Sequence, residues 1–110
     1  MNGNVLTLYV TGEIDHNNAR RIRETADGLI HQKHPSLLNM DFSGVSFMDS
    51  SGIGLIMGRY RTMQLYGGKL RVTEIPVELR RMMELSGLSG LDVLDVPECV
   101  SDDKQGIIQR

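Results

Sequence analysis

The chain has 110 residues, of which 40% are apolar and 24% are charged, and its formal net charge is -2. This composition is typical of one globular domain and argues against disorder. The slight acidic excess disfavours direct DNA binding, because phosphate backbones reward a strong basic excess. No apolar stretch approaches the roughly 18 residues that a membrane span requires. A single cysteine, Cys99, excludes an internal disulfide, and no signal peptide opens the chain, so we expect a cytoplasmic protein.

The first part of the chain predicts two strands with a helix between them. Residues Val5 to Thr11 alternate between apolar and polar faces, and Gly12 follows as a breaker. Asp15 can cap a helix from about His16 to His31. The segment from Ser36 to Phe42 is almost continuously apolar, which predicts a strand that is covered on both faces.

The second part of the chain continues the alternation of helices and strands. The predicted elements are the helix Ile53–Leu65, the strand Lys69–Glu74, a helix with Pro76 at its first position and Gly87 just past its end, the strand Leu91–Val96, and a short helix at about 101–110. This order predicts an α/β domain over residues 1–110. We expect a largely parallel sheet of four or five strands with about four α-helices packed on it.

The segment FMDSSGIG, residues 47–54, joins the second strand to the following helix. It is interpreted as the end of a strand, a short loop and a helix N-terminus. Asp49 and Ser50 are both favoured as N-caps, because their side-chain oxygens can accept from the free N–H groups of the first turn. A helix N-terminus also favours added negative charge. Ser50 is therefore well placed to receive a phosphate.

The helix after Ser50 has two kinds of surface. The arc that we assign to the sheet contains Ile53, Ile56, Met57, Tyr60 and Met63. Gly54 and Gly58 lie outside this arc, next to Leu55, and each glycine costs about 1 kcal/mol relative to alanine. Bare backbone lets another surface approach closely, so these three residues predict a docking patch beside Ser50. The alternative is that the glycines only allow a neighbouring loop to pack.

Enzymatic and metal chemistry have little support in the sequence. No G-x-S-x-G pattern surrounds Ser50, and the scattered histidines His16, His31 and His34 show no ligand spacing with the one cysteine. The Gly52-x-Gly54 fragment lacks the Gly-Lys-Ser/Thr ending of a phosphate-binding loop. We expect no enzyme, no metal and no cofactor.

Two other groups of residues have simple structural interpretations. The first group is expected to fill the core and consists of Met57, Met63, Met82 and Met83. Arg80 and Arg81 are expected to lie on a solvated helix face. Both interpretations are independent of any function.

Three separated motifs resemble those of the anti-sigma factor antagonists, which belong to the STAS domain family. They are TGEIDH at 11–16, FMDSSGIGLIMGRY at 47–60 and MELSGL at 83–88. The motifs have the order and spacing of the family and cover roughly Val5 to Val96. The central motif is most similar to that of the antagonists that act on the sporulation sigma factor, sigma F. The resemblance implies a single STAS domain.

The resemblance also implies a function. In this family the serine after the aspartate, here Ser50, is phosphorylated by an anti-sigma factor serine kinase. The unphosphorylated form binds that kinase and frees a sigma factor for transcription, phosphorylation switches binding off, and a PP2C-type phosphatase restores it. Mg-ATP is supplied by the partner kinase. The partner-binding residues that the resemblance helps to predict are Glu13, Asp15, Asp49, Ser51, Gly54, Leu55 and Gly58.

The chain departs from the family at one point. Family members usually have an additional strand before the one that matches Val5 to Thr11, whereas only Met1 to Asn4 precede it here. A missing or shortened strand leaves an edge that invites pairing, so we expect a monomer or a weak dimer. The alternative function is that of a STAS module that binds a nucleotide, a lipid or another small ligand within a larger complex.

Overall fold

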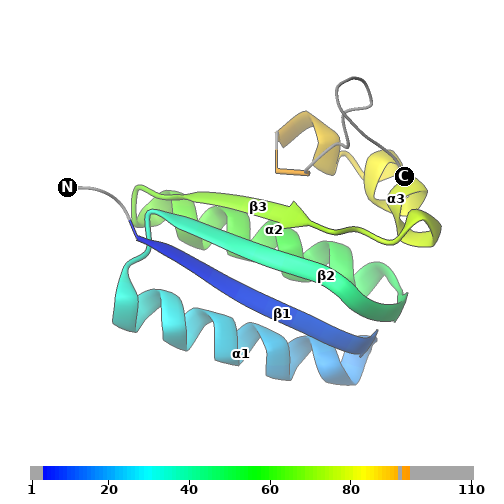
Figure 1. Ribbon diagram of the computed structural model, residues 1–110, viewed down its shortest axis with the longest axis horizontal. Coiled ribbons are helices and arrows are strands. Elements are labelled where there is room, and N and C mark those ends of the chain that lie inside the picture. Colours follow the sequence, from blue (N-terminus) through cyan, green and yellow to red (C-terminus); the bar gives the residue numbers. More distant parts are fainter. Residues whose placement is uncertain (1–3, 92, 95–110) are drawn as a thin grey trace.

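The computed structural model describes residues 4–91 and 93–94 (Figure 1). Its elements are β1 (Val5–Ile14), α1 (His16–Lys33), β2 (Leu37–Met48), α2 (Ser50–Leu65), β3 (Lys69–Thr73), α3 (Val77–Leu85) and a short 3-10 helix, η1 (Leu88–Leu91). The α/β class that the alternating pattern predicts is confirmed.

The described strands form a parallel sheet in the order β1-β2-β3. Right-handed crossovers in this order place α1 and α2 on the same face of the sheet, where the two helices also pack against each other. Strand residues that are buried beneath the helices are Val10, Leu38, Met40, Phe42, Leu70 and Val72. Ile30 of α1 and Ile56 of α2 complete this core from the helix side.

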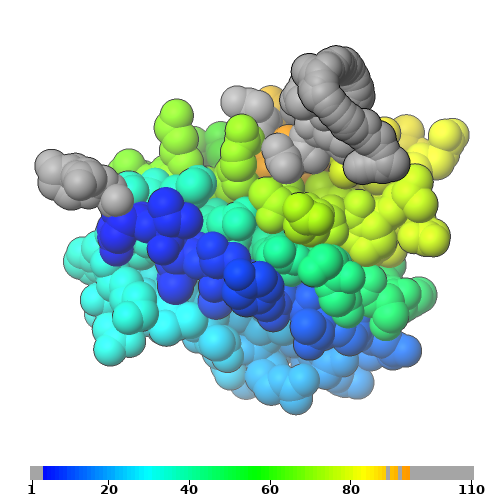
Figure 2. All heavy atoms as spheres, in the orientation of Figure 1, coloured from blue at the N-terminus to red at the C-terminus, as the bar shows by residue number. Residues whose placement is uncertain are grey.

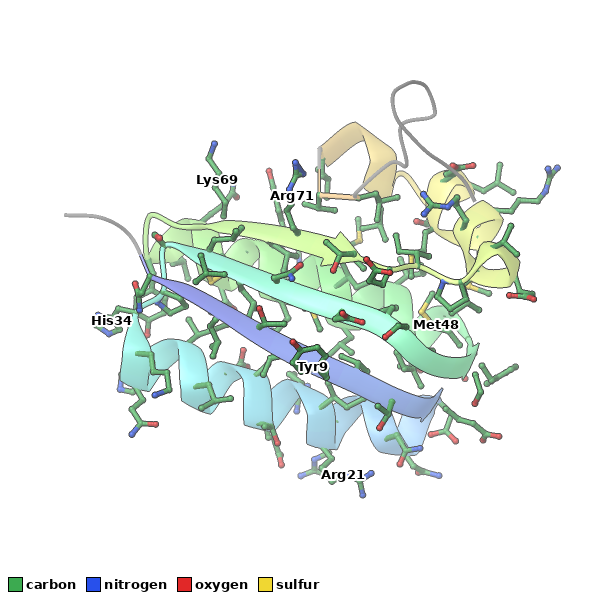
Figure 3. All side chains as sticks on the ribbon, viewed as in Figure 1. Tyr9, Arg21, His34, Met48, Lys69 and Arg71 are labelled. Atoms are coloured by element: carbon green, nitrogen blue, oxygen red, sulfur yellow. The ribbon has the colours of Figure 1, made fainter. Side chains whose placement is uncertain are left out.

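The opposite face of the sheet is polar in the described part of the chain. Tyr9 is 73% exposed, and Asp41 and Arg71 lie on the same face of the neighbouring strands (Figures 2 and 3). The prediction that the strand at Ser36–Phe42 is covered on both faces is therefore wrong within the described part of the chain. Helices cover one face of this strand there, and the other face is open. Its apolar residues alternate with Asn39 and Asp41, whose side chains belong to the open face.

Both long strands extend further than the sequence predicts. β1 continues through Gly12, which has a φ of 84° and lies where the register with β2 shifts. Gly12 thus lies inside the strand, opposite an irregularity of β2, and does not end β1, because glycine adopts this backbone conformation without strain. β2 continues to Met48, so that Asp49 alone separates it from α2. The extensions bring the ends of β1 and β2 side by side.

The predicted strand at Leu91–Val96 differs from the structure. Leu91 ends η1, and Leu94 makes one isolated parallel bridge with Val72. Residues 92, 95 and 96 lie outside the described residues, as does the predicted helix at about 101–110. Within the described part there are three strands and three α-helices, and none of these helices is long and apolar enough to cross a membrane.

Helix α3 has one buried face and an apolar exposed one. Leu79 and Met83 are buried, whereas Met82 is 38% exposed and Leu85 is 74% exposed. The prediction that Met82 belongs to the core is wrong, because these apolar residues spread over an arc wider than the face that packs on the domain. Gly87, with a φ of 93°, stands just past the helix as predicted.

Candidate functional site

Each of the two long strands runs into a helix that an aspartate caps. The Asp15 carboxylate accepts from the backbone N–H groups of Asn17 and Asn18, at 3.1 and 2.9 Å. The Asp49 carboxylate accepts from the N–H of Ser51 at 2.8 Å. Both predicted caps are confirmed, and each satisfies donors that the first helical turn leaves free.

The two capped turns lie next to each other at the carboxyl end of the sheet. The backbone N–H of Asp49 donates to the carbonyl of Ile14 at 3.1 Å. Glu13 is paired with Phe47 in the register of the two strands. The structure therefore brings the segments Glu13–Asp15 and Asp49–Ser51 into one surface, although Asp15 and Asp49 are 34 positions apart in the sequence.

Ser50 is the first residue of α2 and is exposed. The sequence predicted a loop at Asp49–Ser51, but Ser50 and Ser51 both lie in the first helical turn. Ser50 lines a hollow of about 680 Å³ between α2 and α3, together with Ile53, Glu78, Arg81, Met82, Leu85 and Ser86. The sequence analysis did not assign the apolar residues of this hollow, such as Met82 and Leu85, to a functional surface. The spread of apolar residues around α3 was the signal that could have identified them.

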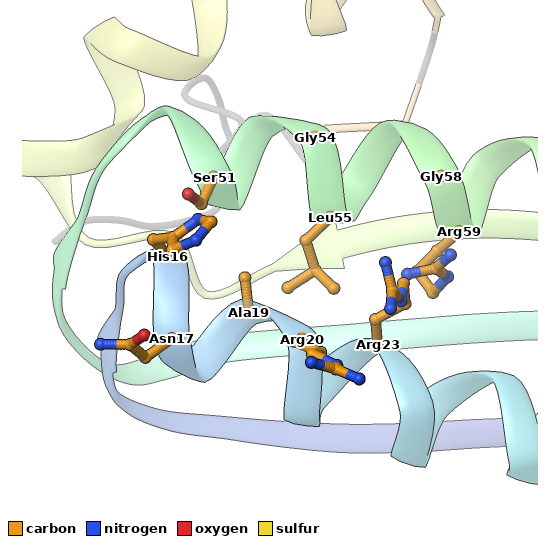
Figure 4. A pocket seen from close by; sticks show the side chains of 10 residues that line it. All are labelled: His16, Asn17, Ala19, Arg20, Arg23, Ser51, Gly54, Leu55, Gly58 and Arg59. Atoms are coloured by element: carbon orange, nitrogen blue, oxygen red, sulfur yellow. The ribbon is translucent and has the colours of Figure 1, made fainter.

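Ser51 faces a different hollow, the α1–α2 cleft, which has a volume of about 670 Å³ (Figure 4). The cleft is lined by His16, Asn17, Ala19, Arg20, Arg23, Ser51, Gly54, Leu55, Gly58 and Arg59. The predicted patch at Gly54 and Gly58 thus lies with Ser51 and not beside Ser50. The reason is helical periodicity, because Gly54 and Gly58 follow Ser51 by three and seven positions and therefore share its side of the helix.

Leu55 does not present its side chain as a docking residue. It is 4% exposed and packs into the core between α1 and α2. Gly54 and Gly58 differ from it, since a Cβ atom at either position would meet no neighbouring atom within 4 Å. The described residues therefore give no support to the alternative that these glycines serve the packing of a loop.

Gly52 has the opposite surroundings. A Cβ atom at this position would collide with the side chain of Met48 and would lie 3.3 Å from Cγ2 of Ile14. Gly52 is buried, so the first turn of α2 rests directly on the ends of β1 and β2. This close approach fixes the position of Ser50 relative to the sheet.

The α1–α2 cleft is positively charged. Arg59 is 5% exposed, and its Nε lies 2.9 Å from Oδ1 of Asp27. These two atoms are not aligned as a hydrogen bond, and Nη1 of Arg59 has no hydrogen-bond partner among the described residues. Burial lowers the pKa of Arg59, the Asp27 carboxylate opposes this, and the charge of Arg23 lowers the pKa further. The sequence analysis did not identify this buried arginine.

The histidines do not form a metal centre in the described part of the chain, where no group of three potential ligands comes together. His31 and His34 are exposed near the end of α1. Nδ1 of His31 shares a hydrogen bond of 2.9 Å with the hydroxyl of Tyr66, at the end of α2. These groups lie at the opposite end of the helices from Ser50.

Comparison with known sequences places this geometry in a family. The model of the STAS domain matches residues 1–96. The chain is 32% identical over 84 residues to the anti-sigma F factor antagonist of Paenibacillus polymyxa. The aligned segment covers 76% of this chain and 72% of that protein. It is 31% identical over 103 residues to the protein of the same name in Lysinibacillus sphaericus, covering 94% and 88%.

Comparison with solved structures agrees. The anti-sigma factor antagonist SpoIIAA in its unphosphorylated form superposes with a TM-score of 0.74 at 28% identity, covering 86% of this chain and 80% of that one. The Bacillus cell fate determinant SpoIIAA in its phosphorylated form gives a TM-score of 0.66 at the same identity, covering 86% and 83%. The chain belongs to the STAS domain family.

Proposed function

We propose that this protein is an anti-sigma factor antagonist whose unphosphorylated form binds an anti-sigma factor serine kinase and so frees a sigma factor for transcription. The observation that carries the proposal is the position of Ser50. Ser50 is exposed, is the first residue of α2 and directly follows the N-cap Asp49. Relatives of this domain are named anti-sigma F factor antagonists. A related structure solved in a phosphorylated form supports phosphate as the switch.

The kinase would supply the catalytic residues, the nucleotide and the magnesium. This chain contributes the Ser50 hydroxyl, whose oxygen takes the γ-phosphoryl group of ATP while ADP leaves and the hydroxyl proton is released. A PP2C-type phosphatase would hydrolyse the phosphate and return the protein to its binding form. In this scheme the antagonist is a substrate and needs no cofactor of its own.

The phosphate is expected to leave the fold unchanged. It adds about -1.5 to -2 charges at neutral pH. The N-terminus of α2 favours that charge by about 0.3–1 kcal/mol. Repulsion from the carboxylate of Asp49 opposes it by up to about 1 kcal/mol in these exposed surroundings. Since the two contributions nearly cancel, the free energy of unfolding should change little.

The same phosphate is expected to act strongly at an interface. Ser50 lies beside exposed apolar side chains of Met82 and Leu85, with the carboxylates of Glu13 and Asp49 in the neighbouring turns. A partner that covers this surface would bury a doubly charged group near these carboxylates, and Arg81 is the single cation among the residues that line the hollow. Truncated or unpaired charges at interfaces cost about 2–5 kcal/mol, which corresponds to a loss of affinity of about 30-fold to several thousandfold.

Mass spectrometry provides the direct test. The protein is incubated with the anti-sigma factor serine kinase of the same organism and Mg-ATP, and the intact mass and the fragments are measured. We expect one added phosphate, located on Ser50. The Ser50→Ala variant should gain none, whereas Ser51→Ala should still be modified. If the kinase phosphorylates another substrate but adds nothing here, the proposed function is wrong, and a phosphate on Ser51 would refute the assigned site.

A further inference from the structure

Helix α3 presents one exposed face to the hollow that contains Ser50. It lies near the start of α2 (Figure 1). Four residues of α3 line the hollow, and all four are exposed: Glu78, Arg81, Met82 and Leu85. Their spacing of three, one and three positions places them on the same side of the helix. Arg81 therefore faces the hollow from the wall opposite Ser50.

The guanidinium group of Arg81 is not engaged in the unmodified protein. It makes no hydrogen bond or ion pair with any residue that the structure describes, and Glu78, one helical turn earlier, is not paired with it. The neighbouring Arg80 differs, because it is only partly exposed and has an interaction of its own. A guanidinium group has five N–H donors in a fixed fork, so Arg81 is available to an anion that comes within its reach.

Carboxylates lie on several sides of Ser50. Asp49 caps its helix, Glu13 lies in the neighbouring turn, and Glu78 lines its hollow. A phosphoryl group on Ser50 would add about -1.5 to -2 charges in these surroundings. Among the described residues that line the hollow, Arg81 is the single side chain whose charge opposes that of the phosphate.

We propose that phosphorylated Ser50 pairs with Arg81 across the hollow between α2 and α3. This pairing rests on the proposed function, since the phosphate is the one that the kinase would add. The Arg81 guanidinium donates to two phosphate oxygens, a geometry that suits arginine better than lysine. Its side chain then extends across the hollow beside Met82 and Leu85. Phosphorylation thus changes the surface of α3 as well as that of α2, and both changes oppose a partner that docks on the apolar hollow.

The pKa of the phosphoryl group reports this contact. The second pKa of phosphoserine is about 6, and a nearby cation lowers it by favouring the dianion. Phosphoserine is installed at position 50 of the full chain during translation, so that no kinase is needed, and its phosphorus NMR signal is followed against pH. We expect the pKa of the phosphoryl group to be about 0.5 higher in Arg81→Gln, which is the size of effect that an exposed ion pair produces.

A matched variant separates this contact from the general field of the protein. Arg61→Gln removes the same charge from an exposed helical arginine that does not line the hollow, and we expect it to leave the pKa of the phosphoryl group unchanged. The Nε–H signal of Arg81 should also shift and exchange more slowly with water in the phosphoprotein than in the unmodified protein. An equal rise of the pKa in both variants, or no rise in Arg81→Gln, would overturn the pairing.

The outcomes distinguish this ion pair from the proposed function. A kinase that phosphorylates Ser50, together with an unchanged pKa in Arg81→Gln, would overturn the ion pair and leave the proposed function standing. A pKa raised by Arg81→Gln, in a protein that the anti-sigma factor serine kinase does not modify, would support the ion pair and contradict the proposed function. Arg81 is exposed, so its substitution should leave the fold intact, and thermal unfolding of each variant checks this.

Discussion

The first turn of α2 separates two hollows of similar size and different chemistry. The hollow on the α3 side, of about 680 Å³, is largely apolar and contains Ser50, whereas the α1–α2 cleft, of about 670 Å³, contains Ser51 and three arginines. Successive residues of a helix point about 100° apart, so two serines that are neighbours in the sequence belong to different surfaces. The comparison teaches that substitutions of Ser50 and of Ser51 probe two different surfaces of the molecule.

The largest effect expected from this comparison is that of phosphate on kinase binding. Phosphorylated Ser50 should weaken the complex about a hundredfold, or about 2.7 kcal/mol. Ser50→Ala should bind permanently, and Ser50→Asp should be weakened less than the phosphoprotein because one carboxylate carries less charge. Calorimetric titration of each form with the kinase measures these affinities. A large backbone rearrangement in the phosphoprotein would contradict a local electrostatic switch.

The glycines of α2 give the next effect. Gly52→Ala should lower the free energy of unfolding by about 1–3 kcal/mol, because the new methyl group collides with Met48. Gly54→Ala is its matched control and should raise that free energy by up to about 1 kcal/mol, since the site is open and alanine favours the helix. Urea denaturation measures both. The same sign of change in the two variants would show that the packing around Gly52 is misjudged.

The apolar hollow predicts an effect on binding without an effect on folding. Leu85→Asp should weaken the kinase complex about tenfold, because a charge replaces an exposed apolar side chain beside Ser50. Leu65→Asp serves as control, since Leu65 is 86% exposed at the far end of α2. Binding assays on both proteins test this. A kinase that responds equally to the two substitutions does not dock at the hollow.

The smallest effect concerns the two aspartate caps. Loss of a cap costs about 1 kcal/mol of stability. Asp15→Ala should cost more than Asp49→Ala, because Asp15 accepts from two backbone N–H groups and Asp49 from one. Thermal unfolding of the two variants under identical conditions gives the comparison. A larger loss at Asp49 would mean that its cap is supported by contacts beyond this hydrogen bond.

Much of this architecture could be predicted from the sequence. Alternating strands and helices established the α/β class, and the aspartates before His16 and Ser50 marked both helix starts. These signals are local, since a cap depends on residues within one turn. The central motif likewise indicated which serine opens α2.

The errors arose where a second surface decides the outcome. The wheel of α2 identified the face toward the sheet, but not the side that α1 covers, so buried Leu55 was taken for a docking residue. Gly12 was interpreted as the end of β1, because its place inside the strand depends on the pairing with β2 and no local pattern shows that pairing. The ion pair of Arg59 with Asp27 joins two helices across 32 positions of sequence, and no local pattern predicts it.

The parallel pairing of the strands has a consequence for how quickly the chain folds. Leu37 of β2 pairs with Val5 on one side and with Lys69 on the other, and each partner lies 32 positions away. Loops of equal length cost the same entropy to close, so the more extensive β1–β2 pairing should form first. Rate measurements on Val10→Ala and Val72→Ala test this order: the β1 substitution should slow folding, and the β3 substitution should mainly accelerate unfolding.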